Sequence, residues 1–253
     1  MKTSLVTPTH NRPEQLSLVV DCINRQTVLP DEWVIADSSG KPLPKEIENK
    51  SVVPITFISD KPDRMPSVCF NFSNAFCAAT GDVCISIEDD DYYPPGYVET
   101  MCSLLVKDNM LACESRNTDY RLSTGYYFIK YTTDSHRSPG CCLFPMHSMA
   151  IRGQQFKREL SELLCKNAYY SWPDLLCCRH FIDNNKYPHA IKDFGVNSTV
   201  SLKDYGIGLA GLCASHRNNN GMQKDDDNFS MFKKLLGEDW KRYEKYLGRL
   251  RDK

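Results

Sequence analysis

Short runs rich in apolar residues alternate with segments of helical periodicity over the first hundred residues. The runs lie at residues 4–7, 32–37, 54–58 and 83–87, and each ends in polar residues, which is typical of buried strands. Between them, apolar residues recur at spacings of three and four, at Leu16, Val19, Val20 and Ile23 and then at Val68, Phe72, Ala75, Phe76 and Ala79. This alternation predicts an α/β fold with a mostly parallel sheet and helices on both faces.

The pattern becomes less regular after residue 100. A helix at 97–107 and a strand at 110–114 are followed by irregular strands at 124–131 and 141–150. Helices are predicted at 154–165 and 173–182, a loop at 215–221, and a charged amphipathic helix from Phe229 onward. The length suits one large core, and no low-complexity linker interrupts it, so we expect one domain, residues 1–253.

Four consecutive acids, Glu88 to Asp91, directly follow the apolar run at 83–87. Residues 92–96 carry strong turn signals, which places these carboxylates at the carboxyl end of a strand, where open α/β sheets bind ligands. Carboxylate oxygens on a short loop suit Mg²⁺ or Mn²⁺. The alternative interpretation is a solvated acidic turn, but the position after a buried strand favours a metal site.

The loop at residues 8–13 leads directly into the first predicted helix. Asn11 is a candidate helix cap, and Pro13 suits the first turn, which has no internal partners for its amides. The loop therefore directs free N–H groups at any molecule that binds there.

The composition is that of an ordinary globular protein. The formal charge is −1, with 25% charged and 41% hydrophobic residues, so overall charge gives no reason to expect nucleic-acid binding. No apolar run is long enough to cross a bilayer and no signal-peptide pattern is present, so we expect a cytoplasmic protein. The twelve cysteines show no Cys-x-x-Cys spacing, which favours buried thiols over zinc ligands or disulfides.

Four segments in this order resemble the opening half of glycosyltransferase family 2, whose members have the GT-A fold. They are residues 6–13, 26–27, 34–40 and 80–91. The resemblance covers residues 3–100 well and the rest of the chain weakly. It implies a nucleotide-sugar-binding half at 1–100, an acceptor and catalytic half at 101–225, and a C-terminal helix at 226–253.

The resemblance also implies roles for single residues. It implies that the base, usually uracil, contacts Asp37, whose alternative role is that of a turn acid. Asp89 and Asp91 match the Asp-x-Asp signature that binds a divalent metal on the donor diphosphate, with Asp90 beside the donor. Arg64 is a candidate contact for the diphosphate or, alternatively, a surface residue. The other residues implied to line the nucleotide pocket are Thr7, Pro8, Thr9, Asn11 and Arg12.

In the family, an acid that opens a late helix often acts as the general base, and Asp174 resembles it, although the usual Glu-Asp pair is here Pro173-Asp174. The alternative role of Asp174 is to favour the helix dipole. Asp183 and Asp204 are weaker candidates. His216 matches a late histidine that completes the metal site in some GT-A enzymes, with a solvated loop histidine as the alternative.

These features together predict a metal-dependent, inverting glycosyltransferase that uses a nucleotide sugar, with UDP as the expected nucleotide and Mn²⁺ or Mg²⁺ as the cofactor. The acceptor is a glycan, a lipid-linked saccharide or a hydroxymethylated pyrimidine in DNA. The basic C-terminal helix would tolerate DNA, and its alternative interpretation is a solvated face, since Glu238, Asp239 and Glu244 interrupt it. The alternatives are a non-catalytic nucleotide-sugar binding module and a nucleotidyltransferase. Two departures from the family concern the part of the pocket that would contact the nucleotide's base. Ala36-Asp37 stands where many members have a double acid, and residues 71–74 stand where they have an Ala-Arg-Asn triplet.

Overall fold

The computed structural model describes residues 1–62, 68–105, 109–114, 116–122, 125–131, 146–170, 173–177, 180–181, 189–192, 200–203 and 223–247. Arg64, Asp183, Asp204 and His216, all singled out from the sequence, lie outside the described residues.

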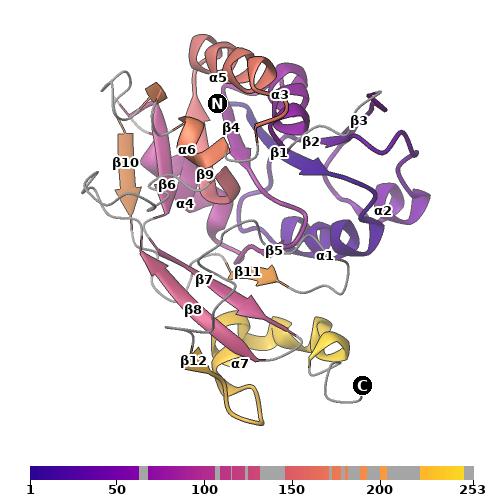
Figure 1. Ribbon diagram of the computed structural model, residues 1–253, viewed down its shortest axis with the longest axis vertical. Helices are drawn as coiled ribbons and strands as arrows, with labels where there is room; N and C mark the ends of the chain where they lie inside the picture. Colours follow the sequence, from indigo (N-terminus) through magenta and orange to yellow (C-terminus); the bar gives the residue numbers. More distant parts are fainter. Residues whose placement is uncertain are drawn as a thin grey trace.

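A seven-stranded, mostly parallel sheet forms the centre of the described part of the chain (Figure 1). Its order is β10-β6-β9-β4-β1-β2-β3, and β9 alone among these strands runs antiparallel to its neighbours. This sheet confirms the predicted fold class. The strands are β1 (Thr3–Thr9), β2 (Glu32–Asp37), β3 (Ile55–Ser59), β4 (Val83–Ser86), β6 (Leu111–Glu114), β9 (Met149–Arg152) and β10 (His189–Lys192).

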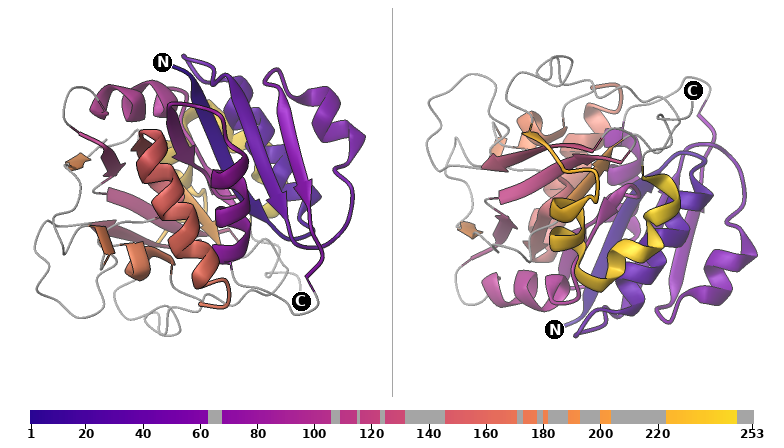
Figure 2. Two further views of the ribbon diagram at one scale, coloured as in Figure 1. Left: turned by 90° about the horizontal axis from the view of Figure 1, so that it is seen from above. Right: turned by 90° about the horizontal axis from the view of Figure 1, so that it is seen from below.

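Alternating residues of the strands supply two separate apolar cores, one on each face of the sheet. Leu5 and Trp33 pack on one face, whereas Val6 and Val34 pack on the other, because successive side chains of a strand point in opposite directions. The first face is covered by α1 (Pro13–Asn24), α2 (Lys45–Lys50) and α4 (Tyr97–Leu104), and the second by α3 (Val68–Ala78), α5 (Gln154–Lys166) and α6 (Pro173–Cys177). Figure 2 shows α3 and α5 side by side on one face.

A second sheet of five strands lies below the first in Figure 1, in the order β12-β8-β7-β11-β5. Its shortest strands include β5, which begins at Asp91 of the acidic run and pairs with β11. The sequence pattern did not predict β5 or β7, since neither is an apolar run of ordinary length. The strands are β5 (Asp91–Tyr92), β7 (Arg116–Arg121), β8 (Tyr126–Tyr131), β11 (Val200–Lys203) and β12 (Gln223–Lys224).

The predicted C-terminal helix is much shorter than expected. The helix α7 (Ser230–Leu236) ends at Gly237, whose φ is 56°, and two 3-10 helices follow at Gly237–Arg242 and Glu244–Tyr246. A positive φ cannot continue a right-handed helix, and glycine adopts it without steric cost. The segment folds back against α1 instead of presenting one continuous basic face (Figure 2).

Among the described residues no helix combines the length and apolar character of a membrane span. The eight described cysteines are free thiols, five of them buried, in line with the prediction of buried thiols.

Candidate functional site

An open pocket of about 290 Å³ lies where β1, β2 and β3 end. Parallel strands bring their carboxyl ends to one edge of a sheet, so the loops that follow them converge there. The residues that line the pocket are His10, Asn11, Ser38, Ser39, Lys41, Lys61 and Pro62.

The carboxylate of Asp37 is held at the end of β2 by two backbone N–H groups. Its Oδ2 accepts a hydrogen bond from the amide of Asn11 at 3.2 Å, and its Oδ1 accepts one from the amide of Ser39 at 2.6 Å. Each oxygen keeps a second lone pair for a further donor. Asn11 has a φ of 53°, and the N-cap residue of α1 is Arg12. The predicted cap at Asn11 was therefore wrong, whereas the prediction of Pro13 in the first turn is confirmed.

Asn71 of α3 ties the loops after β1 and β2 together. Its side-chain amide donates to the carbonyl of Thr9 at 2.7 Å and to the hydroxyl of Ser38 at 3.1 Å. His10 adds a 3.0 Å hydrogen bond between its Nδ1 and the same hydroxyl. Asn71 was not among the predicted site residues, because a buried asparagine within an apolar helix carries no sign of its partners.

Thr7 and Pro8, both predicted to line the nucleotide pocket, are buried within β1. The Thr7 hydroxyl accepts a 2.8 Å hydrogen bond from the indole N–H of Trp33, which is itself fully buried. A contact between either residue and a nucleotide stays a prediction.

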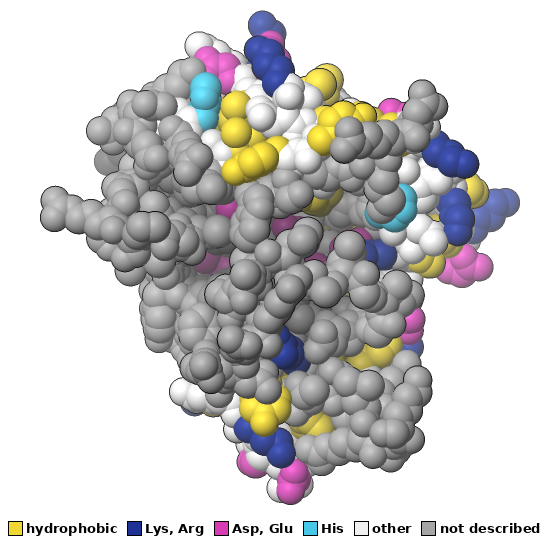
Figure 3. Space-filling view, viewed as in Figure 1, with side chains coloured by type: hydrophobic (Ala, Val, Ile, Leu, Met, Phe, Trp, Pro, Cys, Tyr) yellow, Lys and Arg dark blue, Asp and Glu magenta, His cyan; other side chains and the backbone are white. Residues whose placement is uncertain are grey.

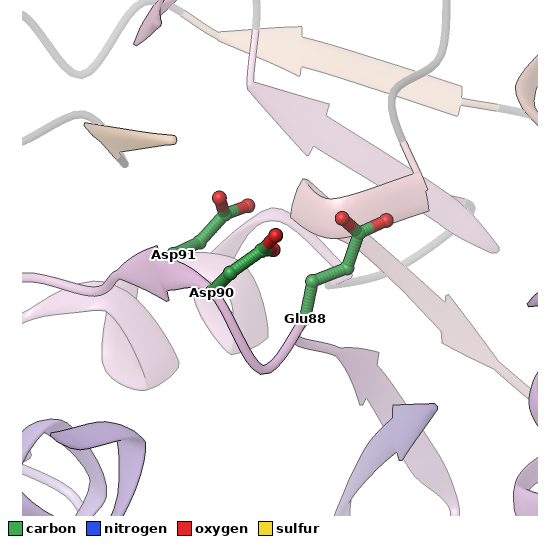
Figure 4. A group of neighbouring side chains, drawn as sticks. All are labelled: Glu88, Asp90 and Asp91. Atoms are coloured by element: carbon green, nitrogen blue, oxygen red, sulfur yellow. The ribbon is translucent and has the colours of Figure 1, made fainter. Parts of the chain in front are cut away.

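Three acids of the loop between β4 and β5 come together. Glu88, Asp90 and Asp91 each direct a carboxylate oxygen to one place, with these oxygens within 4.8 Å of one another (Figure 4). The amide of Glu88 donates to the hydroxyl of Tyr93 at 2.7 Å, and Asp91 lies opposite Ser201 in the second sheet. Three convergent carboxylates form a donor set of the hard oxygen type that Mg²⁺ and Mn²⁺ accept. The residues present therefore fit a divalent cation.

Asp89 lies outside this group of three. It is 4% exposed, and its carboxylate accepts hydrogen bonds from the Thr9 hydroxyl at 2.5 Å and from Nη1 of Arg12 at 2.8 Å. Burial and the neighbouring charge of Asp90 raise the pKa of Asp89 to about 6, against the lowering influence of Arg12. The predicted metal role of Asp89 stays a prediction, and Glu88, which was absent from the predicted site, takes its place in the group.

Asp174 is connected to the end of β4 through the 3-10 helix at Met146–Ser148. Its Oδ1 accepts a 2.8 Å hydrogen bond from the amide of Met146, and the carbonyl of Met146 accepts one from the hydroxyl of Ser86. Ser86 ends β4 two residues before Glu88. These contacts join the first turn of α6 to Ser86, the last residue of the strand that leads into the acidic loop.

Acidic side chains are visible near the centre of the face shown in Figure 3, with a basic side chain next to them. Two basic side chains of the C-terminal segment are paired with acids of α1. Lys245 lies 3.3 Å from Glu14, and Arg242 lies 3.2 Å from Asp21.

Three comparisons with known proteins agree on the kind of protein that this chain resembles. A family model described as glycosyl transferase family 2 matches residues 4–152. The protein named uncharacterized glycosyltransferase YwdF, from Bacillus subtilis, is 30% identical over 111 residues, which are 40% of this chain and 37% of that protein. The chain therefore matches little more than a third of this curated relative's length.

Among solved structures, the chain is similar to the mannosyltransferase PcManGT from Pyrobaculum calidifontis in complex with GDP-Man and Mn²⁺. The TM-score is 0.55 at 13% sequence identity, and the match covers 81% of this chain and 58% of that one. At this identity the likeness concerns the fold.

Proposed function

The chain belongs to glycosyl transferase family 2, and on this premise we propose that it transfers a sugar from a nucleotide-sugar donor to a hydroxyl group of an acceptor. The observation that best supports this proposal is the convergence of Glu88, Asp90 and Asp91 at the end of β4. The loop after β1 connects this group to Asp37, since the amide of Asn11 donates to Asp37 and the side chain of Arg12 contacts Asp90. A cation site next to a pocket at the carboxyl ends of parallel strands suits a phosphate-bearing ligand.

Glu88, Asp90 and Asp91 would hold Mn²⁺ or Mg²⁺. When bound there, the cation would neutralise negative charge on the departing diphosphate. In this proposal Asp89 positions the loop by binding Thr9 and Arg12, and the group of three provides the ligands. His216 remains a further candidate ligand, as the sequence resemblance implies.

The pocket at the ends of β1, β2 and β3 would hold the nucleoside. Asp37 is oriented by two N–H groups and retains acceptor capacity for a base N–H or a ribose hydroxyl. Asn11 lines this pocket, and Thr9 and Arg12 connect it to the acidic loop. We propose UDP as the nucleotide, with Arg64 as a further contact to its diphosphate.

Asp174 is our proposed general base. Its carboxylate is held by the amide of Met146, close to the end of β4, and acts on the acceptor. In the reaction, the acceptor oxygen forms a bond to the anomeric carbon, the bond from that carbon to the diphosphate breaks, and the acceptor proton moves to Asp174. In-line attack inverts the configuration at the anomeric carbon.

We propose a saccharide hydroxyl as the acceptor and not a base in DNA. Lys245 and Arg242 of the C-terminal segment are engaged by acids of α1, and Lys241 lies 2.9 Å from Glu238. Basic side chains with acidic partners at hand give a weaker electrostatic footprint for DNA than basic side chains without such partners.

The first test is nucleotide release from a panel of UDP-sugars and GDP-sugars, measured by mass spectrometry with Mn²⁺, with Mg²⁺ and with a chelator. We expect metal-dependent release from one donor and a loss of about a hundredfold in Asp91→Asn, because the bound cation would lower the activation barrier by several kcal/mol. Asp60→Asn, which changes an exposed acid after β3, is the matched control and should release nucleotide normally. Nucleotide binding without release from any donor would instead indicate a binding module.

A second test addresses the base and the acceptor. Asp174→Asn keeps the size of the side chain, and we expect it to lower kcat by about a hundredfold or more with little change in the KM for the donor. Saccharide acceptors and hydroxymethylated duplex DNA are offered in parallel. Transfer to the DNA alone would refute the proposed acceptor class.

A further inference from the structure

Arg12 contacts two acids of the acidic loop through a single nitrogen. Its Nη1 lies 2.8 Å from Oδ1 of Asp89 and 3.1 Å from Oδ2 of Asp90. Arg12 is the N-cap residue of α1, and its carbonyl accepts the amide of Leu16. Its backbone is therefore anchored, and only the side chain reaches the loop.

The two acids differ in how firmly they are held. Asp89 has a second donor, the Thr9 hydroxyl, and its side chain is 5% exposed. The side chain of Asp90 is 21% exposed, and Asp90 also belongs to the group with Glu88 and Asp91. Asp90 thus lies between two positions for positive charge, the guanidinium of Arg12 and the centre of the three carboxylates.

We propose that Arg12 is an exchangeable internal counter-ion. In the metal-free protein its guanidinium neutralises Asp90, and when a divalent cation binds, the Asp90 carboxylate leaves the guanidinium and binds the cation. This inference rests on the proposed function, because it concerns the same cation site. Arg12 keeps its contact with Asp89 after the exchange. The guanidinium therefore loses only its contact with Asp90 and stays next to the acidic loop.

Electrostatics gives the reason for such an exchange. Four successive carboxylates repel one another, and a nearby guanidinium relieves part of this repulsion when no cation is present. The same positive charge opposes the approach of a divalent cation and occupies one of its ligands. Arg12 therefore lowers the affinity for the metal while it stabilises the loop.

The test is Mn²⁺ binding to the whole chain without donor, followed by the electron paramagnetic resonance signal of free Mn²⁺. We expect Arg12→Gln to bind Mn²⁺ about tenfold more tightly, since Asp90 no longer has to give up a charge-assisted hydrogen bond to the guanidinium when the cation binds, and such a bond is worth about this much. A merely structural role of Arg12 would give weaker binding or no change, and either result would overturn the inference.

A double-mutant cycle separates exchange from simple repulsion. In the Asp90→Asn background the contested ligand is absent, so we expect Arg12→Gln to change the affinity less than twofold. A full tenfold gain in that background would show repulsion alone and overturn the exchange. Arg242→Gln, which removes a paired surface arginine, is the control and should leave Mn²⁺ binding unchanged.

If Arg12→Gln fails to fold, Asp89→Asn is compared with Asp89→Asn combined with Arg12→Gln, because Arg12 keeps Asp90 as a partner in the first variant and the second neutralises both members of the buried pair. The double variant should bind Mn²⁺ more tightly than Asp89→Asn, and equal or weaker binding would contradict the inference. Absence of binding in every protein would refute the proposed metal site together with the inference. Binding by the parent chain with no gain in the variants would refute the inference alone.

Discussion

Glu32 joins three segments at the amino ends of the central strands. Its Oε1 accepts the hydroxyl of Ser4 at 2.5 Å and the amide of Thr80 at 2.6 Å, and its Oε2 accepts the hydroxyl of Thr80 at 2.8 Å. Lys2 lies 3.6 Å away, and the amide of Gly81 donates to the same Ser4 hydroxyl. The perturbation is Glu32→Gln, which keeps the shape of the side chain and removes its charge.

The pKa of Glu32 sets the magnitude of the effect. Burial alone would raise this pKa, but hydrogen bonds from Ser4 and Thr80 and the charge of Lys2 lower it from 4.5 to about 2. At 1.36 kcal/mol per pH unit, this difference corresponds to at most about 3.4 kcal/mol of folding free energy. The side chain is 13% exposed, and because solvent screens part of the interaction, we expect about 2 kcal/mol.

The pH dependence follows from the sign of the shift. A carboxylate with a lowered pKa in the folded state contributes its full stability above pH 4.5, and this contribution is lost as the pH falls towards 2. Urea denaturation followed by circular dichroism should therefore show Glu32→Gln about 2 kcal/mol less stable than the parent chain at pH 7. The difference should shrink steadily between pH 4.5 and pH 2.

Two results would refute this reasoning. One is a loss of stability below about 0.5 kcal/mol at pH 7, which would show that the charge of Glu32 contributes no more than an exposed pair does. The other is a loss that is the same at pH 3 and pH 7, which would assign the effect to shape alone. Glu48→Gln, at an exposed position of α2, is the control and should change stability little at any pH.

Three further predictions concern the second sheet, the pair of strands β1 and β2, and the turn after β2. The carboxylate of Asp225 accepts hydrogen bonds from the Tyr120 hydroxyl at 2.8 Å and from two backbone N–H groups at the start of α7. Asp225→Ala should therefore lower the free energy of unfolding, measured in urea, by about 3 kcal/mol, and a loss below about 1 kcal/mol would contradict this. Thr7→Val leaves the buried Trp33 N–H without its acceptor and should cost about 1–2 kcal/mol while UDP affinity, measured by calorimetry, stays within twofold. Gly40 has a φ of 72°, and an added Cβ would lie 2.8 Å from the Cβ of Lys61, which lines the pocket at the ends of β1, β2 and β3. Gly40→Ala should therefore weaken UDP binding in the same assay. Unchanged affinity would argue against a nucleotide in this pocket.

The sequence alone placed β1 to β4, α1 and α3, because the information for them is local, but it did not predict α2 or β5. Short apolar runs mark β1 to β4, a period of 3.6 residues marks α1 and α3, and the polar residues that follow each strand mark its carboxyl end. The acidic loop could be placed at that end of β4 for the same reason. The match of a family model to residues 4–152 agrees with this order of elements.

Only the tertiary structure decided which acids face one another. Four consecutive carboxylates are equivalent by any local rule, and Asp89 is set apart by Thr9 and Arg12, which lie 80 and 77 residues earlier in the chain. The strand β5 likewise exists because β11 pairs with it, and Asn71 matters because two loops from other strands meet its amide. Contacts between residues so far apart in sequence produce no periodic pattern in either segment. Which residues form the site is therefore determined by the packing of the folded chain.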